Sequence, residues 1–558
     1  MNRPDQAAFN WSEVPMNNVE RVEVLRGPAG VLYGDHAVAG VINIITRKSA
    51  EEMERDLSVQ AGSHGFHDES AAVRGSIDGL GYAASINHQS ADGYRDHSRY
   101  DTKSAALNLE YGDEDAAEVY FSLNAAESQY QLPGALKEAE MDADREQSQP
   151  FHNDNAEEQS IFADFGIRIE PGAEQSLLLD IGYGRRNINA EFHVTDPFWA
   201  YDTWTEYKID RWTASPKYRL TRPLGRFDNE LLIGTDVGYE RLDTEQVNRD
   251  MFGTTSADAH MNRWTVGAYA LDSLYLSDEL IASLGGRREK YDIDFEESGS
   301  AGNIDESKGR YENAFHGGLT WLPHERLKLF TRYEEFYRFP STDEQAAYYG
   351  YFGVDGFNAN IEPESGRSYE AGCTVHPLDT LELEGTVFRM EMKDEIAFDG
   401  ATLVNYDDTL HQGLELAATY RPADWVRMKL WYTLLEATFT EGVDDGKDIP
   451  LAPQNEVDLN MDFFLDEHWT LNTHFAWLDN QFVAGDTANA ADGLEAYALF
   501  DAFVRYKTTL GGCEVEAFAG AENIFEEEYV FYASNYGADT TYYPAPERVF
   551  KGGVSVRF

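Results

Sequence analysis

The feature that most restricts the fold is an alternation of polar and apolar side chains that continues from about residue 54 to the C-terminus. In residues 117–125, for example, apolar side chains occupy every second position, which is the period of a β-strand with two chemically different faces. The same period recurs at 456–463 and 500–507. A soluble β-sandwich does not usually sustain such strands over this length without an intervening helix. The pattern therefore predicts one large all-β domain.

The connections between the predicted strands alternate in length. Short ones carry turn-forming residues, as at Asp78-Gly79 and Gly511-Gly512. The longer connections are expected near 128–156, 188–204, 241–262, 294–310 and 337–366, among others. Short turns at one end and long loops at the other are typical of a bacterial outer-membrane barrel, whose strands cross the bilayer with roughly ten residues each. Counting through the pattern gives about 22 strands, so we expect an antiparallel transmembrane β-barrel.

The composition fits this fold and narrows the function. No stretch approaches the ~18 uninterrupted apolar residues of a membrane-spanning helix. The net charge is −55, from 100 acidic and 45 basic residues, which disfavours binding of nucleic acid by a basic surface. Two interpretations of the acidity stay open, a saline habitat and the binding of cations by external loops. Cys373 and Cys513 fit no metal-ligand spacing, and are expected either as small apolar fillers or as one disulfide.

Residues 19–48 read VERVEVLRGPAGVLYGDHAVAGVINIITRK. This run is similar to the last part of the plug domain of TonB-dependent receptors, in which a strand ending in Leu-Arg-Gly-Pro is followed by Leu-Tyr-Gly and a second strand of the type Val-Ile-Asn-Ile-Ile-Thr. The resemblance continues in the barrel, for instance at 338–340, 360–365 and 543–548. The plug-motif residues are Glu23, Arg26, Gly27, Pro28, Tyr33, Gly34, Gly40 and Asn43.

The resemblance implies two parts, residues 1–50 as the C-terminal part of a plug domain and residues 51–558 as the barrel. A complete plug in this family is longer, so we expect that the N-terminal part of the plug, with the segment that contacts TonB, is missing, as is a signal peptide. The resemblance further implies a monomeric receptor embedded in the lipid of the cell outer membrane, which takes up a scarce nutrient with the help of TonB. Plug charges such as Glu23 and Arg26 are implied to pair with barrel-wall residues of opposite sign.

The ligand is predicted from the aromatic and cationic residues of the external loops. Aromatic rings give a large contact area and stack on planar chelators, and arginine has the donors for an anionic complex. The resemblance implies that a haem receptor of this family would carry a histidine ligand on the loop between Pro340 and Asn360. No histidine lies in this segment, so haem is disfavoured. A ferric siderophore is the first expectation, and cobalamin is the alternative within the family. The predicted ligand contacts are Arg95, Trp199, Trp204, Arg338, Tyr348, Tyr349, Tyr351, Phe352 and Tyr536.

Functions of other classes find less support. The sequence has no Gly-x-Ser-x-Gly, no His-Glu-x-x-His and no phosphate-binding glycine loop, so we predict no enzyme, no catalytic residue, no cofactor and no metal site. A passive porin-like channel is the stronger rival. A porin would lack a plug, and residues 19–48 argue against it.

Overall fold

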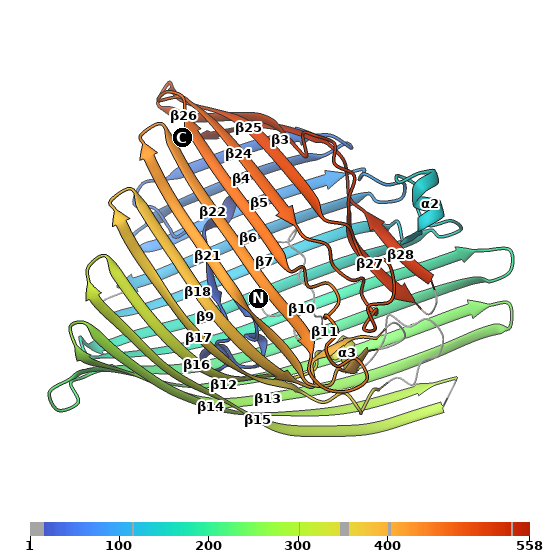
Figure 1. Ribbon diagram of the computed structural model, residues 1–558, viewed down its shortest axis with the longest axis horizontal. Helices are drawn as coiled ribbons and strands as arrows, with labels where there is room; N and C mark the ends of the chain where they lie inside the picture. Colours follow the sequence, from blue (N-terminus) through green and yellow to red (C-terminus); the bar gives the residue numbers. More distant parts are fainter. Residues whose placement is uncertain (1–15, 114–115, 301, 346–356, 400–402, 537–538) are drawn as a thin grey trace.

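A closed barrel surrounds residues 16–48 in the computed structural model of the chain, which describes residues 16–113, 116–300, 302–345, 357–399, 403–536 and 539–558 (Figure 1). Within these ranges, 22 antiparallel strands form the barrel, which confirms the predicted fold class. The barrel closes where the last strand, β29 (Val549–Arg557), pairs with the first, β3 (Glu54–Gly62).

The remaining barrel strands follow in chain order and are β4 (His67–Ile77), β5 (Leu80–Ala91), β6 (Tyr100–Asp113), β7 (Ala117–Leu132), β9 (Asp154–Gly172), β10 (Gln175–Thr195), β11 (Ala200–Thr221), β12 (Asp228–Asp250), β13 (Gly253–Ser277), β14 (Leu280–Gly299), β15 (Gly302–His324), β16 (Leu327–Arg338), β17 (Glu364–Leu378), β18 (Leu381–Lys393), β21 (Thr409–Ala423), β22 (Val426–Phe439), β23 (Asn455–Phe464), β24 (Trp469–Leu478), β25 (Tyr497–Leu510) and β26 (Cys513–Glu522).

The outer face of the barrel carries an exposed apolar belt. Val59, Ile86 and Val554 are large apolar side chains on this face, and all three are exposed. Successive side chains of a strand point to opposite faces, so the intervening residues face the lumen. Tryptophans follow the short turns at one end of the belt, as Trp425 and Trp469 do. An apolar belt edged by aromatic rings is the outer surface that a barrel needs in a bilayer.

The short turns have the geometry that their sequences predict. Asp78 has φ 50° and Gly79 has φ 84°, so both central residues of the β4–β5 turn adopt positive φ. This is the type I′ turn, whose twist matches the right-handed twist of the flanking strands, and Asp-Gly is one of its preferred sequences.

The expectation of long loops is wrong for 188–204, 241–262 and 294–310. There the strands β10 to β15 continue as paired hairpins with short tips, and β12 and β13 stay in register out to the pair Asp250–Gly253. These strands are longer than the other strands of the barrel, as the long green strands of Figure 1 show. On these hairpin parts the outward side chains, such as Asn189 and Glu191, are polar because they meet water rather than lipid, while apolar side chains such as Ile188 point into the lumen.

Residues 16–48, which we call the inner segment, lie in the barrel lumen. They form η2 (Met16–Asn18), β1 (Val19–Arg26), α1 (Gly30–Tyr33), η3 (Gly34–His36) and β2 (Gly40–Thr46), and β1 pairs with β2 as an antiparallel hairpin. The α1 turn packs against β13 to β16 of the wall.

Outside the barrel ring, small elements cover its open end. They are β8 (Leu136–Lys137), α2 (Glu138–Ala143), α3 (Thr342–Gln345), β19 (Ile396–Phe398), β20 (Leu403–Asn405), β27 (Val530–Tyr536) and β28 (Asp539–Pro544). Cys373 and Cys513 are both free thiols. Within the described part of the chain, no helix combines the length and the apolar composition needed to cross a membrane.

Candidate functional site

The candidate site is the contact between the inner segment and the barrel wall. It begins where β1 ends, at Gly27, which has φ +71° and donates its backbone N–H to the carbonyl of Ala39 at 3.1 Å. A side chain at Gly27 would collide with the paired side chains of Arg332 and Glu370 on the wall. Two separate features therefore require glycine at this position, the positive φ of the backbone and the close approach to the wall.

A buried ion pair joins the tip of the inner segment to the wall. Asp35, in η3, accepts a hydrogen bond from Arg263 of β13 at 3.1 Å. Their side chains are only 8% and 3% exposed, respectively. Two charges at this depth must be paired, because either one alone would lose its hydration without compensation.

A second charge cluster lies next to the first on β12, β14 and β16. Arg287 donates to Glu289 at 2.6 Å and to Asp236 at 2.7 Å. The hydroxyl of Tyr337 donates to Glu289 at 2.7 Å. Gly34 of the inner segment, with φ +70°, approaches Arg287 and Glu289 so closely that a side chain would contact both. The cluster thus forms the surface on which the tip of the inner segment rests.

The plug charges that the sequence singles out pair in two different ways. Arg26 forms an ion pair with Glu415 of the wall at 3.4 Å, as the family resemblance implies. Glu23 instead pairs within the inner segment, where it accepts from Arg21 at 2.8 Å and from the Asn43 amide at 3.4 Å. One of the two expected plug-to-wall contacts is therefore present.

Apolar packing accompanies these charges. Val31 of α1 is buried in a cluster with lumen-facing side chains of β10 to β16. Tyr291 and Tyr337, two of these neighbours, are fully buried. Burial of a side chain the size of valine contributes about 1.5–3 kcal/mol, so this apolar contact also helps to hold the inner segment.

A cavity of about 230 Å³ lies beside the tip of the inner segment. Its wall residues come from β11 to β14, and its floor comes from α1 and η3. Four cationic and four anionic side chains line it, so their formal charges balance in a chain that is otherwise strongly acidic. The cations are Arg211, Lys217, Arg263 and Arg287, and the carboxylates are Asp35, Asp236, Glu240 and Glu289.

The remaining plug-motif residues lie in the same region. Pro28 is buried directly after β1, and Tyr33 is exposed at the end of α1, where its side chain lines the cavity. Gly40 begins β2 opposite Arg26, and a side chain there would collide with the carbonyl of Leu25. All eight motif residues thus belong to one hairpin and its connection.

The predicted ligand contacts that lie among the described residues occupy separate places. Arg338 is held between Glu344 of α3 and Glu364 of β17, with N–O distances of 2.8 and 2.6 Å. Arg95 is buried and donates to the backbone carbonyls of Pro133, Gly134 and Gln147. Both guanidinium groups therefore hold loops in place.

The predicted aromatic contacts occupy different positions. Trp199 lies at the tip of the β10–β11 hairpin and is 49% exposed. Trp204 and Trp212 are an even number of residues apart on β11, so their side chains are on the same face of the strand. The buried Tyr207 is on the other face, toward the lumen. Trp204 therefore points to the outer face, where Arg249 lies over its ring. Tyr536 belongs to β27. Tyr348, Tyr349, Tyr351 and Phe352 lie outside the described residues.

Reasoning from the sequence missed the barrel-wall half of the site. Asp35 stands next to the recognised Gly34, so its position in the plug motif is a usable signal. Arg263 and Arg287 carry no such signal, because polar residues recur at every second position of each strand. Only the three-dimensional register shows which of them meets the inner segment.

The docking of the inner segment is expected to weaken as the pH falls. Burial lowers the pKa of His36 to about 4, although the adjacent Asp35 carboxylate acts to raise it. In a released segment, His36 would have its ordinary pKa of 6.5 and would bind a proton at a pH where the docked His36 stays neutral. Docking free energy is therefore lost as the pH falls from about 6.5 toward 4. We expect a loss of about 1–2 kcal/mol between about pH 7 and pH 5.

Hydrogen exchange of the α1 and η3 amides as a function of pH measures this effect. Substitution of His36→Gln should flatten the profile over the same range, since glutamine does not titrate. An unchanged profile in that variant would assign the pH dependence to other groups.

Two family models match the sequence. The model described as TonB dependent receptor-like, beta-barrel matches residues 60–524, and the model described as TonB-dependent Receptor Plug Domain matches residues 1–41. The barrel model alone covers more than half of the chain.

Individual proteins align at low identity over nearly the whole chain. The vitamin B12 transporter BtuB of Photobacterium profundum is 21% identical over 93% of this chain and 78% of its own length. The metal-pseudopaline receptor CntO of Pseudomonas aeruginosa is 23% identical over 95% of this chain and 78% of its own length. The structure of the ferric yersiniabactin uptake receptor FyuA from Yersinia pestis superimposes with a TM-score of 0.84, at 16% identity, over 97% of this chain and 85% of that one.

Proposed function

The chain belongs to the TonB-dependent receptor family, and from this premise we propose that it takes up a ferric siderophore across the outer membrane. The apolar belt and its tryptophans are the surface that would contact outer-membrane lipid. We infer that residues 1–50 act as plug and residues 51–558 as barrel. A monomer is expected, since the barrel closes on itself within one chain.

The observation that carries the ligand proposal is the charged cavity beside the inner segment, in which four cations balance four carboxylates. Arg211, Arg263 and Arg287 line it, although the chain as a whole carries a net charge of −55. In this acidic protein, these cations offset the local negative charge and so reduce the repulsion that an anionic ferric complex would meet beside the inner segment. The cavity would widen when Asp35 leaves Arg263.

Uptake then proceeds in two stages. The extracellular loops capture the chelate, with Trp199 as an exposed aromatic contact among the described residues. We propose that Tyr348, Tyr349, Tyr351, Phe352 and Tyr536 contribute further contacts. A pull from TonB next breaks the few buried ion pairs that hold the inner segment, and the ligand passes along the lumen. Arg338 would act indirectly, by fixing the base of the loop that follows β16.

Cobalamin is the second candidate, and two observations favour it. A vitamin B12 transporter aligns over 93% of the chain, and the strongly acidic surface would repel a highly anionic chelate at the entrance. The two candidates differ in ligand charge and size, so direct binding separates them.

A fluorescence titration of the detergent-purified protein tests the proposal. Ferric hydroxamate, ferric catecholate, haem and cobalamin are added in turn while tryptophan emission is recorded. We expect saturable quenching by one of the two ferric chelates. The variant Trp199→Phe should lose more of the quenching amplitude than the matched variant Trp425→Phe, whose ring lies beside a short turn at the other end of the barrel.

The other outcomes are equally definite. Saturable quenching by cobalamin alone would overturn the siderophore assignment and leave the receptor assignment intact. A steady large conductance of the unmodified protein in planar bilayers, with no response to any of these ligands, would instead favour a passive porin-like channel.

A further inference from the structure

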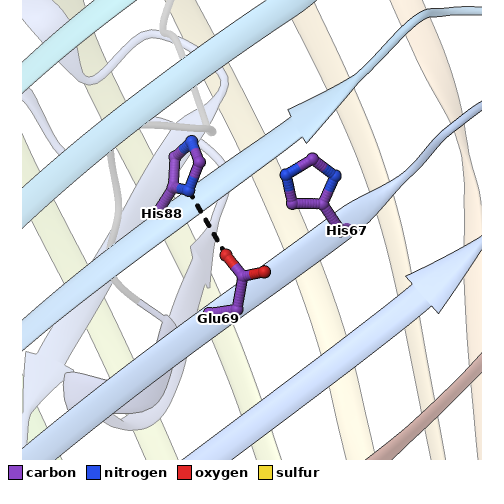
Figure 2. A group of neighbouring side chains, drawn as sticks. All are labelled: His67, Glu69 and His88. Carbon is purple, nitrogen blue, oxygen red and sulfur yellow. Dashed lines mark ion pairs between the residues drawn. The ribbon is translucent and has the colours of Figure 1, made fainter.

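Three metal-ligating side chains lie together on β4 and β5, on the face of the barrel wall opposite to the inner segment. Glu69 and His88 are directly opposite each other in the strand pairing, and the His88 Nδ1 lies 3.3 Å from a Glu69 carboxylate oxygen. The ring of His67 lies edge-on to that of His88, with centroids 5.5 Å apart. One ligand atom from each of the three residues lies within 4.8 Å of the other two. Figure 2 shows the three side chains on the same side of the two strands.

The cluster is on the outer face of the barrel. Glu69 pairs across β3 with Val59, and His88 follows the exposed Ile86 by two positions, so both have the phase of the apolar belt. His67 begins β4 at the end opposite to the short turn at Asp78. The three ligands therefore lie at the extracellular edge of the belt, where ions from the medium have access. The lumen and the transport path are on the other side of the wall.

Neighbouring groups orient both imidazole rings. A carboxylate oxygen of Asp101, on β6, lies 3.1 Å from Nε2 of His88, and the carbonyl of Gly65 lies 3.2 Å from Nδ1 of His67. If each of these nitrogens donates its proton outward, Nδ1 of His88 and Nε2 of His67 keep free lone pairs toward the centre of the cluster. The Ser90 hydroxyl, 3.0 Å from Nε2 of His67, can donate to that lone pair when no ion is bound. Carboxylates and carbonyls commonly hold metal-bound histidines in this way.

We propose that His67, Glu69 and His88 bind one divalent transition-metal ion of the Zn²⁺ type. Two ligands of a tetrahedral zinc ion lie about 3.3–3.5 Å apart, which matches the distance between His88 and Glu69. Two imidazoles and one carboxylate favour such an ion over Mg²⁺ or Ca²⁺, which prefer oxygen ligands. Because β4 and β5 are rigid neighbours, the ion would join them at the rim. The inference departs from the expectation that the chain has no metal site, and it does not depend on the transported ligand.

An ion-pair interpretation accounts for part of this geometry. His88 lies between Glu69 and Asp101, and as a protonated imidazole it would bridge the two carboxylates without any metal. In that interpretation, His67 has no role in the cluster. The test therefore compares His67 and His88, because a metal site needs both rings.

Cobalt binding to the untagged, detergent-purified and chelator-treated protein provides the measurement. Co²⁺ bound by nitrogen and oxygen in a tetrahedral site gives visible absorption that Zn²⁺ abolishes by displacement. We expect one such ion per chain. Substitution of His67→Ala or His88→Ala should each remove the signal, and Asp101→Asn should weaken the affinity by about 10–100-fold, as is usual for a residue that orients a ligand.

The control is His376→Ala, which removes an exposed histidine paired with Glu382 at 2.7 Å on the β17–β18 hairpin. It should bind Co²⁺ like the unsubstituted protein. Heat-modifiable migration on gels shows that each variant has formed its barrel. The proposal is overturned if the unsubstituted protein shows no saturable Co²⁺ spectrum, or if His67→Ala keeps a spectrum that Zn²⁺ still displaces.

Discussion

Replacement of Arg263 by methionine is expected to lower the free energy that holds the inner segment in the lumen by about 3–5 kcal/mol. The substitution keeps the size of the side chain and removes its charge. Asp35 would then be left as a buried carboxylate next to His36, 3.3 Å away, without its guanidinium partner. Removing one partner of a buried ion pair costs more than the pair contributes, because the other charge stays desolvated.

The double variant Arg263→Met with Asp35→Asn separates the loss of the pair from the cost of the uncompensated charge. With neither charge present, most of the lost free energy should return. The surface control is Arg241→Met on β12, whose partner Asp243 is 2.9 Å away and whose own side chain is largely exposed. An exposed pair contributes about 0–1 kcal/mol, so this variant should behave almost like the unsubstituted protein.

Two measurements report on the inner segment. Hydrogen exchange of the α1 and η3 amides should accelerate by roughly 10²–10⁴-fold in the Arg263→Met variant, which is the stated free energy expressed as an equilibrium. Planar bilayers should show opening events that the unsubstituted protein lacks. If the Arg263→Met variant exchanges as slowly as the unsubstituted protein, the ion pair does not hold the segment, and the apolar contact of Val31 must do so.

The barrel could be predicted because its signal is local and repeated. The alternation of polar and apolar side chains can be read within each strand. The sequence of a short turn such as Asp78-Gly79 is enough to predict its turn type. The final strand pairs with the first, for example at Val554–Val59. This closure follows from an even number of antiparallel strands around one lumen. The long hairpins of β10 to β15 escaped prediction because their upper parts lack the apolar outward face that marks a strand in the bilayer.

The site could be predicted only on the side of the inner segment. Arg26 and Glu415 are 389 positions apart in the sequence, and Asp35 and Arg263 are 228 apart. In a chain with 100 acidic residues, nothing local identifies which carboxylate or guanidinium lies at the height of the inner segment. The positions of side chains along one strand are more informative than the charges, because every second side chain is on the same face. Trp204 stands eight positions before Trp212 on β11, and this even spacing already places both on the outer face.

Replacement of Arg338 by methionine is expected to destabilise the loop between β16 and β17 by about 3–5 kcal/mol. The Arg338 guanidinium lies between two buried carboxylates, those of Glu344 and Glu364. Each carboxylate also receives a backbone N–H, from Ser341 at 2.7 Å and from Ile396 at 2.7 Å. Without the arginine, two buried negative charges would repel each other across the base of the loop, and these backbone hydrogen bonds could not compensate for the lost charge.

Hydrogen exchange of the described amides in 339–345 and 357–363 measures this loss, and the triple variant with Glu344→Gln and Glu364→Gln tests its cause. Neutral amides keep the shape and much of the hydrogen bonding, so the triple variant should recover most of the protection. The exposed pair of Arg326 with Asp379 at a short turn provides the control, and Arg326→Met should change the exchange little. Fast exchange in the triple variant would mean that the loop needs the positive charge itself. Arg338 would then again be a candidate for direct contact with an anionic ligand.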